Sequence, residues 1–194
     1  MVDLSKFDNS HYDPGRSSFV RALWFFAGLP ILRSSILPSS GLRCRLLRLF
    51  GARIGKGVVI KPGFRVKNPW FMAVGDHCWL GEDAWIDNLT TVAIGDHACI
   101  SQGAYLCTGN HDWADPAFGL IVGPIQIGNG AWVGARACIA PGTVIGEGAV
   151  VALGSVAAGR IPPYEIHAGN PAKFVRHREI RQTGIERQPV GSGR

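Results

Sequence analysis

Charged side chains are scarce in this sequence. Asp, Glu, Lys and Arg make up 18% of its 194 residues, where roughly a quarter is usual. Hydrophobic residues make up 46%, which excludes a wholly disordered chain. Residues 16–56 contain no acidic residue but eight Lys and Arg, and the whole chain has a net charge of +6. That excess suits an anionic ligand, a nucleic acid or a membrane surface and does not choose among them.

Paired cysteines and long apolar runs are also missing. Five cysteines are present without any CxxC pair, which favours a reducing compartment and no structural zinc. The longest apolar run, residues 22–32, is too short to span a bilayer and contains Pro30. No charged start with a small-residue cleavage site frames it, so a signal peptide is not expected. These features together predict a cytoplasmic protein.

Glycine is abundant, at 26 residues, but follows no Gly-X-Y period, which excludes collagen. What repeats is an aliphatic residue (Ala in the last unit) at every sixth position, with short breaks. The series is Ile54, Ile60, Val66, Val74, Leu80, Ile86, Ile94, Ile100, Leu106, Ile127, Val133, Ile139, Ile145, Val151 and Ala157. Glycine often follows the aliphatic residue directly, and we expect it to relieve turns that need positive φ.

A period of six fits neither a helix nor an alternating strand. It fits a short strand and a turn, so that three units form a triangular coil with the aliphatic residues inside. Three buried aliphatics contribute about 1.5–3 kcal/mol each, whereas ordering each backbone residue of the coil costs about 1–2 kcal/mol. Coils must therefore stack to be stable. The alternative is a β-sandwich with chance spacing, and fifteen in-phase positions count against it.

The predicted architecture is a mostly β, parallel β-helix of about five coils over residues 54–162, with residues 112–126 extruded as a loop. Residues 1–53 lack the repeat and are predicted to form short helices with apolar and Arg faces. They either cap the open end of the core or contact a membrane surface as a basic amphipathic segment. Residues 163–194 are predicted to form a short basic helix, from Ala172 to Gln182, and a loose tail.

Three features carry a resemblance to a known family: the repeat units, TGNHDW at 108–113 and IPPYEIHAGNPAK at 161–173. Over residues 52–178 the chain resembles the left-handed parallel β-helix acyltransferases with hexapeptide repeats, especially galactoside, maltose and nodulation acetyltransferases. LSKFDNSHYDPGRSSFVRALWFF and WIDNLTTVAIGDH resemble the colanic-acid-type exopolysaccharide O-acetyltransferases more closely still. The resemblance implies a left-handed homotrimer with active sites between neighbouring prisms. It also implies acetyl-CoA as donor, a sugar hydroxyl as acceptor, no metal and no acyl-enzyme.

The resemblance places His111 in the catalytic position. An imidazole, with an unperturbed pKa of about 6.5, is suited to take the acceptor's proton and pass a proton to the CoA thiolate. Without the resemblance, a lone His at a loop edge is equally read as a solvent-facing polar residue. Asp112 is a candidate to orient His111, although neighbours in sequence often point apart. The oxyanion donor in this fold is usually a backbone N–H, which the sequence does not identify.

Acceptor contacts are predicted one coil earlier. Asp87 falls where the sugar acetyltransferases place an acceptor-contacting Asn, and Asn88 follows it. Ordinary turn polarity is the alternative for both. Trp85 and Trp113 either stack on a sugar face or cover the seam of the trimer.

Contacts to acetyl-CoA are carried over by position in the family. Small side chains and backbone amides along a prism edge hold the pantetheine arm, and cations hold the phosphates. The predicted set is Trp132, Ala135, Leu153, Ala158, Gly159, Lys173 and Arg176. A solvated basic helix is the alternative for the last two.

Other functions compete with acetyl transfer. His77 and His97 recur in successive GDH turns, but no third ligand follows at Gly130, which disfavours a metal site and a zinc carbonic anhydrase. A binding scaffold without catalysis remains open, as does N-acetylation of an amino sugar or antibiotic. Nucleic-acid binding has only net charge in its favour. The basic N-terminal segment is the candidate for peripheral contact with the inner membrane.

Overall fold

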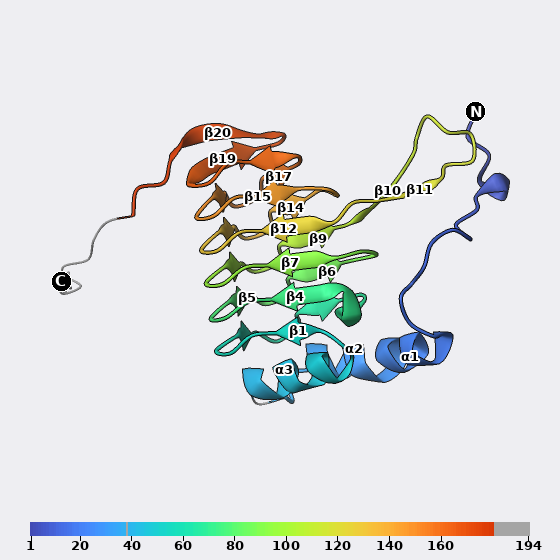
Figure 1. Cartoon of the computed structure of the whole chain (residues 1–194), viewed down its shortest axis with the longest axis horizontal. Coiled ribbons are helices and arrows are strands. Elements are labelled where there is room, and N and C mark those ends of the chain that lie inside the picture. The colour runs from blue at the N-terminus through green and yellow to red at the C-terminus, as the bar shows by residue number, and fades with distance from the viewer. Residues whose placement is uncertain (38, 181–194) are drawn as a thin grey trace, which may run out of the picture.

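The computed structural model describes residues 1–37 and 39–180, and its central part is a triangular prism of stacked coils (Figure 1). Each side of the prism is a sheet whose strands come from successive coils and pair in parallel. Sheet A contains β1 (Arg53–Ile54), β4 (Met72–Val74), β7 (Val92–Ile94), β12 (Ile125–Ile127), β15 (Val144–Ile145) and β18 (Arg160–Ile161). The predicted parallel β-helix is confirmed, with six coils where about five were predicted.

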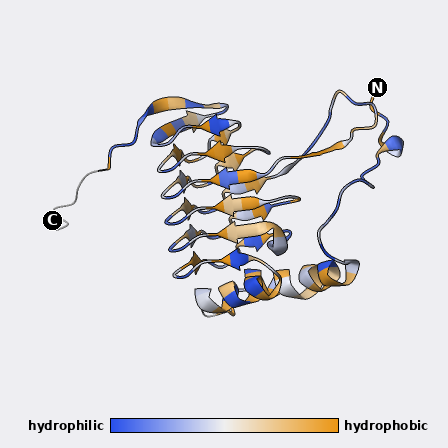
Figure 2. Cartoon of the chain, viewed as in Figure 1, coloured by the Kyte–Doolittle hydropathy of each residue, from blue (hydrophilic) through white to orange (hydrophobic). Residues whose placement is uncertain are grey.

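The other two sides have the same construction, except that the last strand of sheet B pairs antiparallel. Sheet B contains β2 (Val59–Ile60), β5 (Trp79–Leu80), β8 (Cys99–Ile100), β13 (Trp132–Val133), β16 (Val150–Val151), β19 (Glu165–Gly169) and β20 (Ala172–His177). Sheet C contains β3 (Arg65–Val66), β6 (Trp85–Asp87), β9 (Tyr105–Cys107), β14 (Cys138–Ile139) and β17 (Val156–Ala157). Figure 2 shows that hydrophobic residues recur in the stacked strands of the prism.

The repeated aliphatic residues form the core of the prism. In sheet B, Ile60 pairs with Leu80 and Leu80 with Ile100, so that equivalent side chains stack on one another inside. All three are at most 1% exposed. Small residues two positions earlier, such as Ala84 and Ala104, are also fully buried. The register that the sequence predicts is therefore the register that buries one continuous apolar column.

Glycine has two different roles in the coils. The glycine directly after the aliphatic residue was predicted to adopt a positive φ, and that prediction is wrong. Gly134 lacks a positive φ, and a Cβ there would lie 2.5 Å from the amide nitrogen of Leu153 in the next coil. The close approach of the coils therefore requires this glycine. Positive φ occurs two residues further on in the turn, where Gly154 (φ 67) stands beside open space. His77 and Arg136 adopt the same conformation in other turns, so this position tolerates side chains.

The N-terminal helices lie across the first coil (Figure 1). They are α1 (Ser18–Leu23), a π-helical turn (Trp24–Gly28), α2 (Leu29–Arg33) and α3 (Ser40–Leu49). Two 3₁₀ turns lie elsewhere, Leu4–Lys6 near the N-terminus and away from the first coil, and Pro69–Phe71 between coils. Leu47 is fully buried, and the Arg48 guanidinium donates to the carbonyls of Ile54 and Gly55. Trp24 is buried and donates its indole N–H to the Val66 carbonyl at 3.1 Å. These contacts cover the open end of the core.

The predicted C-terminal helix is wrong over the described residues. Ala172–His177 forms β20, which folds back antiparallel on β19 and extends sheet B. The strand forms because β19 offers an unpaired edge at the last coil, and pairing satisfies its backbone groups. Residues 181–194, which include the predicted tail, lie outside the described residues. Among the helices that the structure describes, none is long and apolar enough to cross a membrane.

We predict that Gly134→Ala destabilises the protein more than Gly154→Asn does. The new Cβ at position 134 meets backbone of the next coil, which cannot move aside, and such overpacking costs about 1–3 kcal/mol. Asn tolerates the left-handed conformation at position 154 and meets open space. Thermal unfolding of both variants measures the difference, expected to be several degrees. Equal midpoints would contradict the close-approach argument.

Candidate active site on the protruding hairpin

A β-hairpin leaves the prism at the corner between sheets C and A. Its strands are β10 (Gly109–His111) and β11 (Leu120–Val122), which pair antiparallel. It therefore begins three residues before the predicted loop. The base is closed by the Gly123 N–H, which donates to the Thr108 carbonyl at 2.8 Å, and the buried Thr108 hydroxyl accepts from the Leu89 N–H at 2.7 Å. These bonds fix the hairpin to the rigid prism, so its side chains have defined positions.

His111 is held by Phe118 from across the hairpin. The two rings stack with centroids 4.4 Å apart and an angle of 6°, and His111 Nδ1 lies 2.9 Å from the Phe118 carbonyl oxygen. A carbonyl only accepts hydrogen bonds, so Nδ1 carries the proton and Nε2 keeps its lone pair. The predicted candidate for orienting His111, Asp112, instead accepts from the Ala114 N–H in its own turn. Phe118 has a φ of 52, which the turn imposes.

The N-terminal arm, residues 1–15, reaches the same hairpin (Figure 1). The Phe7 ring lies 5.6 Å from the His111 ring, and the Asp3 N–H donates to the Pro116 carbonyl at 2.8 Å. The Tyr12 hydroxyl donates to the Leu89 carbonyl at 2.8 Å. Sequence reasoning missed Phe7 and Phe118, because both lie outside the repeat and no spacing links them to His111.

Asp87 lies on the outer face of sheet C among polar partners. Lys67 Nζ is 3.0 Å from one carboxylate oxygen, and the Tyr105 hydroxyl donates to the other at 3.0 Å. Burial raises the pKa of Tyr105 far above its ordinary value, and hydrogen bonds with Cys107 and Asp87 raise it further. The Trp85 ring lies 4.9 Å from Tyr105. This face therefore presents an aromatic surface with a carboxylate, a lysine and a phenol beside it.

Asn88 has a structural role, which corrects its prediction as an acceptor contact. Its side chain is fully buried, accepts from the Asn68 N–H at 2.9 Å and donates to the Asn68 carbonyl at 2.8 Å. These bonds join two coils at the corner where strands of sheet C end. Trp113, by contrast, is 76% exposed near the end of the hairpin.

The predicted CoA contacts fall on separate parts of one prism. Ala135 and Leu153 share the corner between sheets B and C, where the Gly154 N–H donates to the Ala135 carbonyl at 2.8 Å. Ala158 and Gly159 occupy the corner between sheets C and A, two strands above the start of the hairpin. Both are exposed, as is Leu153.

The remaining CoA candidates lie on sheet B. Trp132 is 46% exposed on its outer face and donates its indole N–H to the Ser101 hydroxyl at 2.8 Å. Lys173 and Arg176 stand on β20, at the end of the same sheet, and are exposed. Within a single chain, the structure thus brings Lys173 and Arg176 toward neither His111 nor the corner at Gly159.

His77 and His97 stack at the corner between sheets A and B, with ring centroids 5.3 Å apart. The next turn at this corner has Gly130, whose N–H donates to the Asp96 carbonyl. Over residues 1–37 and 39–180, no group of three His, Cys, Asp or Glu residues is arranged to hold a metal ion.

Comparison with known proteins identifies the family. The family model for the bacterial transferase hexapeptide (six repeats) matches residues 124–159. The Escherichia coli (strain K12) protein WcaF, named for acetyl transfer in colanic acid biosynthesis, is 39% identical over 178 residues, which are 92% of this chain and 98% of WcaF. The chain belongs to the hexapeptide-repeat acetyltransferases. Rv3034c of Mycobacterium tuberculosis, named as a probable acetyltransferase, is 34% identical over 55% of this chain and 37% of its own length.

Solved structures of hexapeptide-repeat acetyltransferases have the same left-handed β-helix. The acetyltransferase VCA0836 of Vibrio cholerae, solved with acetyl coenzyme A, has a TM-score of 0.73 at 26% identity and covers 93% of this chain and 100% of its own. A galactoside acetyltransferase in complex with coenzyme A has a TM-score of 0.73 at 23% identity, covering 84% of each chain. The second likeness concerns the fold alone.

We predict that, in Tyr105→Phe, the free energy of unfolding falls less steeply as the pH rises above about 10. An unfolded tyrosine ionises near pH 10, whereas folded Tyr105 resists ionisation because its pKa is raised. Its contribution to stability is therefore fully present below about pH 10 and is lost as the pH rises further. Urea unfolding at intervals from pH 8 to pH 11 measures this slope.

Tyr164→Phe is the matched control, because Tyr164 is exposed and its hydroxyl bonds to Glu147 at 2.8 Å. Its effect on the slope is expected to be smaller. If Tyr105→Phe unfolds with the same alkaline slope as the unchanged protein, the phenol is not held neutral by its surroundings.

Proposed function

We propose that this acetyltransferase transfers the acetyl group of acetyl-CoA to a hydroxyl of an exopolysaccharide or its saccharide precursor, with His111 as general base. The observation that carries the proposal is the bond between His111 Nδ1 and the Phe118 carbonyl, 2.9 Å long. It leaves Nε2 as the basic nitrogen on a fixed ring at the edge of the prism. The identity to WcaF supports the choice of acceptor class.

The proposed reaction is direct transfer. Nε2 takes the proton of the acceptor hydroxyl while the hydroxyl oxygen attacks the thioester carbonyl. The tetrahedral intermediate collapses, the carbon–sulfur bond breaks, and the imidazolium returns the proton to the departing CoA sulfur. General base catalysis of this kind contributes about 10²–10⁴-fold. The thiol of Cys107 lies 3.1 Å from the Gly109 carbonyl and donates to it, which supports a mechanism without a cysteine acyl-enzyme.

We infer that the working enzyme is a homotrimer in which each site is shared. Lys173 and Arg176 are on sheet B, whereas His111 leaves the corner between sheets C and A. One donor molecule reaches both groups when sheet B of one prism faces the hairpin corner of another. Trp132, Ala135, Leu153, Ala158 and Gly159 then line the cleft between the two chains, with no metal involved.

Asp87, Trp85 and Trp113 are proposed to contact the acceptor. The carboxylate of Asp87 pairs with Lys67 through a buried Oδ1 and accepts from Tyr105 at Oδ2, and a remaining lone pair of Oδ2 can accept from a sugar hydroxyl. Arg65 lies over one face of the Trp85 ring, and the remaining aromatic surface of Trp85 is proposed to contact the sugar. The five free cysteines favour a cytoplasmic site of action.

Two variants are expected to separate catalysis from donor binding. His111→Asn should bind acetyl-CoA as the unchanged protein does but lose about 10²–10⁴-fold in acetyl transfer, because no base remains. Lys173→Ala/Arg176→Ala should weaken acetyl-CoA binding, since each charged hydrogen bond to phosphate is worth about 1.5–3 kcal/mol. Calorimetric titration and transfer to an exopolysaccharide fraction measure these effects.

The product distinguishes the acceptor group, because an O-acetyl ester is removed by mild alkali and an N-acetyl amide survives it. Saturation near one acetyl-CoA per chain is expected. A chain that binds no acetyl-CoA at millimolar concentration would contradict the proposal, and so would full activity of His111→Asn.

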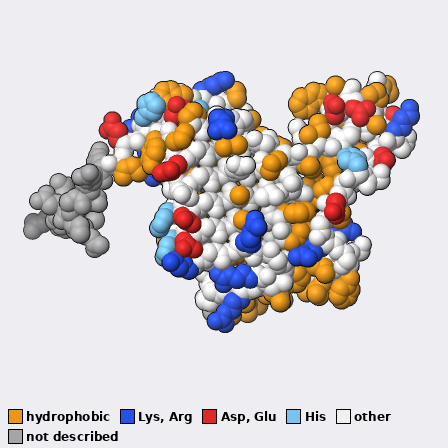
Figure 3. All heavy atoms as spheres, viewed as in Figure 1, with side chains coloured by type: hydrophobic (Ala, Val, Ile, Leu, Met, Phe, Trp, Pro, Cys, Tyr) orange, Lys and Arg blue, Asp and Glu red, His pale blue; other side chains and the backbone are white. Residues whose placement is uncertain are grey.

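We further propose that the N-terminal helices contact a membrane surface rich in anionic lipid. Phe19 and Phe26 are each 76% exposed and Leu49 is 80% exposed, although a prism end normally hides such residues. Figure 3 shows hydrophobic side chains gathered over the N-terminal helices, with Lys and Arg nearby. Exposed aromatic residues beside basic residues are the pattern of an interfacial helix.

Phe19→Ser/Phe26→Ser is expected to reduce pelleting with anionic liposomes by about tenfold or more. Each ring that is removed takes away about 1.5–3 kcal/mol of favourable free energy from burial in the membrane surface. Ile121→Ser is the matched control, since Ile121 is exposed on the hairpin, away from the helices. High salt should weaken binding of the unchanged protein. If the unchanged protein stays in the supernatant with anionic liposomes at low salt, the membrane proposal fails.

A further inference from the structure

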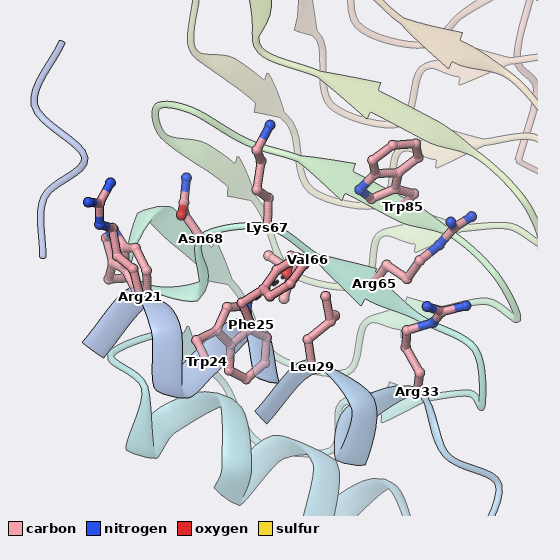
Figure 4. Close-up of a pocket in the computed structure, with 11 residues that line it drawn as sticks. Arg21, Trp24, Phe25, Leu29, Arg33, Arg65, Val66, Lys67, Asn68 and Trp85 are labelled. Carbon is pink, nitrogen blue, oxygen red and sulfur yellow. Dashed lines mark hydrogen bonds between the residues drawn. The ribbon is translucent and has the colours of Figure 1, made fainter. Parts of the chain in front are cut away.

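A pocket of about 410 Å³ lies where the N-terminal helices meet the outer face of sheet C (Figure 4). Its floor is apolar and is formed by Trp24, Phe25 and Leu29 from the helices and Val66 from β3. Its rim carries four cations: Arg21, Arg33, Arg65 and Lys67. A basic rim around an aromatic floor suits a ligand that is anionic at one point and apolar or aromatic beside it.

Three of the four cations have no carboxylate partner among the residues that the structure describes. Lys67 pairs with Asp87, whereas Arg21 donates only to the Ser18 hydroxyl at 3.1 Å. Arg65 has a buried Nε without a hydrogen-bond partner, and its guanidinium lies 4.8 Å from the centre of the Trp85 ring. Stacking on Trp85 holds the Arg65 fork in place without neutralising it.

Like charges gathered at one pocket repel one another, and an anion bound between them removes that cost. Figure 4 shows the guanidinium groups of Arg33 and Arg65 on the same side of the pocket, one from α2 and one from β3. Two planar forks from different elements match the oxygens of a phosphate or diphosphate group, which arginine binds bidentately. The rim is therefore suited to phosphate more than to a single carboxylate.

The pocket is aligned with the candidate catalytic residue. Arg65 begins β3 and Lys67 follows it, Asp87 ends β6, and β9 leads into the hairpin of His111. Neighbouring strands lie about 4.8 Å apart, so the rim is about 10 Å from the coil that carries His111. The Trp85 and Tyr105 rings lie between them. A short saccharide attached to a phosphate group fits this arrangement, with its sugar on the rings and its phosphate on the rim.

We propose that this pocket binds the phosphate or diphosphate group through which the acceptor saccharide is attached to its carrier. The inference rests on the proposed function and specifies its substrate as a sugar phosphate ester rather than a free sugar. An adjoining pocket of about 650 Å³ shares Phe25, Leu29 and Arg33 and adds Phe26. This second pocket offers an apolar surface beyond the phosphate, on which the carrier can lie. The carrier is either an apolar chain or a nucleoside.

The phosphates of acetyl-CoA are a poor match for this pocket. Their proposed partners, Lys173 and Arg176, are on the last strand of sheet B, whereas the pocket is at the first coil. The two ends of the prism therefore bind different anions. This separation allows donor binding and carrier binding to be measured independently.

Calorimetric titration of the unchanged protein with farnesyl diphosphate, uridine diphosphate, inorganic pyrophosphate and farnesol tests the proposal. We expect saturable binding of a diphosphate probe near one per chain and none of the uncharged farnesol. Tighter binding of farnesyl diphosphate than of uridine diphosphate indicates a lipid carrier, and the reverse order indicates a nucleotide carrier. Failure of all three diphosphates to bind would overturn the proposal.

Arg33→Gln/Arg65→Gln is expected to lower the affinity for the diphosphate by about tenfold or more, because charge-assisted hydrogen bonds are lost. Arg45→Gln/Arg53→Gln is the matched control, because it removes the same charge from exposed residues outside the pocket. Arg33→Gln alone, at an exposed residue, covers the case in which the double variant does not fold. Unchanged diphosphate binding in both pocket variants would also overturn the proposal.

The result is separable from the proposed function. Acetyl-CoA binding should be unaffected in Arg33→Gln/Arg65→Gln, and diphosphate binding should be unaffected in His111→Asn. If acetyl-CoA binds and the diphosphates do not, the carrier pocket is wrong while acetyl transfer stands. If the diphosphates bind and acetyl-CoA does not, the acetyl-transfer proposal is wrong and the pocket is an anion site of another function.

Discussion

The parallel hydrogen-bond ladder between coils is the interaction on which the rest of the structure depends. A single coil buries too little apolar surface to offset its own ordering, so each coil is stable only on its neighbour. The ladder explains why glycine is required where backbones approach, as at Gly134, and why Asn88 is buried against Asn68. It also places chemically useful side chains at intervals of one strand spacing on each outer face.

Much of the fold was predictable because the residues that repeat every six positions are the residues that become buried. The inward aliphatic residues follow from the period of six, and the position of the extruded segment follows from its longest break. The C-terminal strand was not predictable from that period. Ala172–His177 is rich in basic residues and reads as a helix in isolation, but the free edge of β19 recruits it into sheet B. A tertiary partner thus overrides local preference.

The candidate site was predictable only in part, for a related reason. His111 is marked by its position in a resembling motif, whereas its partner Phe118 acts through a backbone carbonyl, which any residue supplies. The rim of the carrier pocket combines Arg33 from a helix with Arg65 from a coil, and no sequence spacing connects them. Asp112 stood next to His111 in sequence, yet it follows the end of β10 and its carboxylate accepts from the Ala114 N–H of the turn.

The N-terminal arm has a consequence for the order in which the molecule assembles. Coils contact partners that are close in the chain, so they can add one after another from the helical base. The bond from the Asp3 N–H to the Pro116 carbonyl instead joins the start of the chain to the hairpin, across the three coils that precede it. Such a contact closes a long loop and forms late. We therefore expect the surroundings of His111 to be completed only after the prism on which they rest.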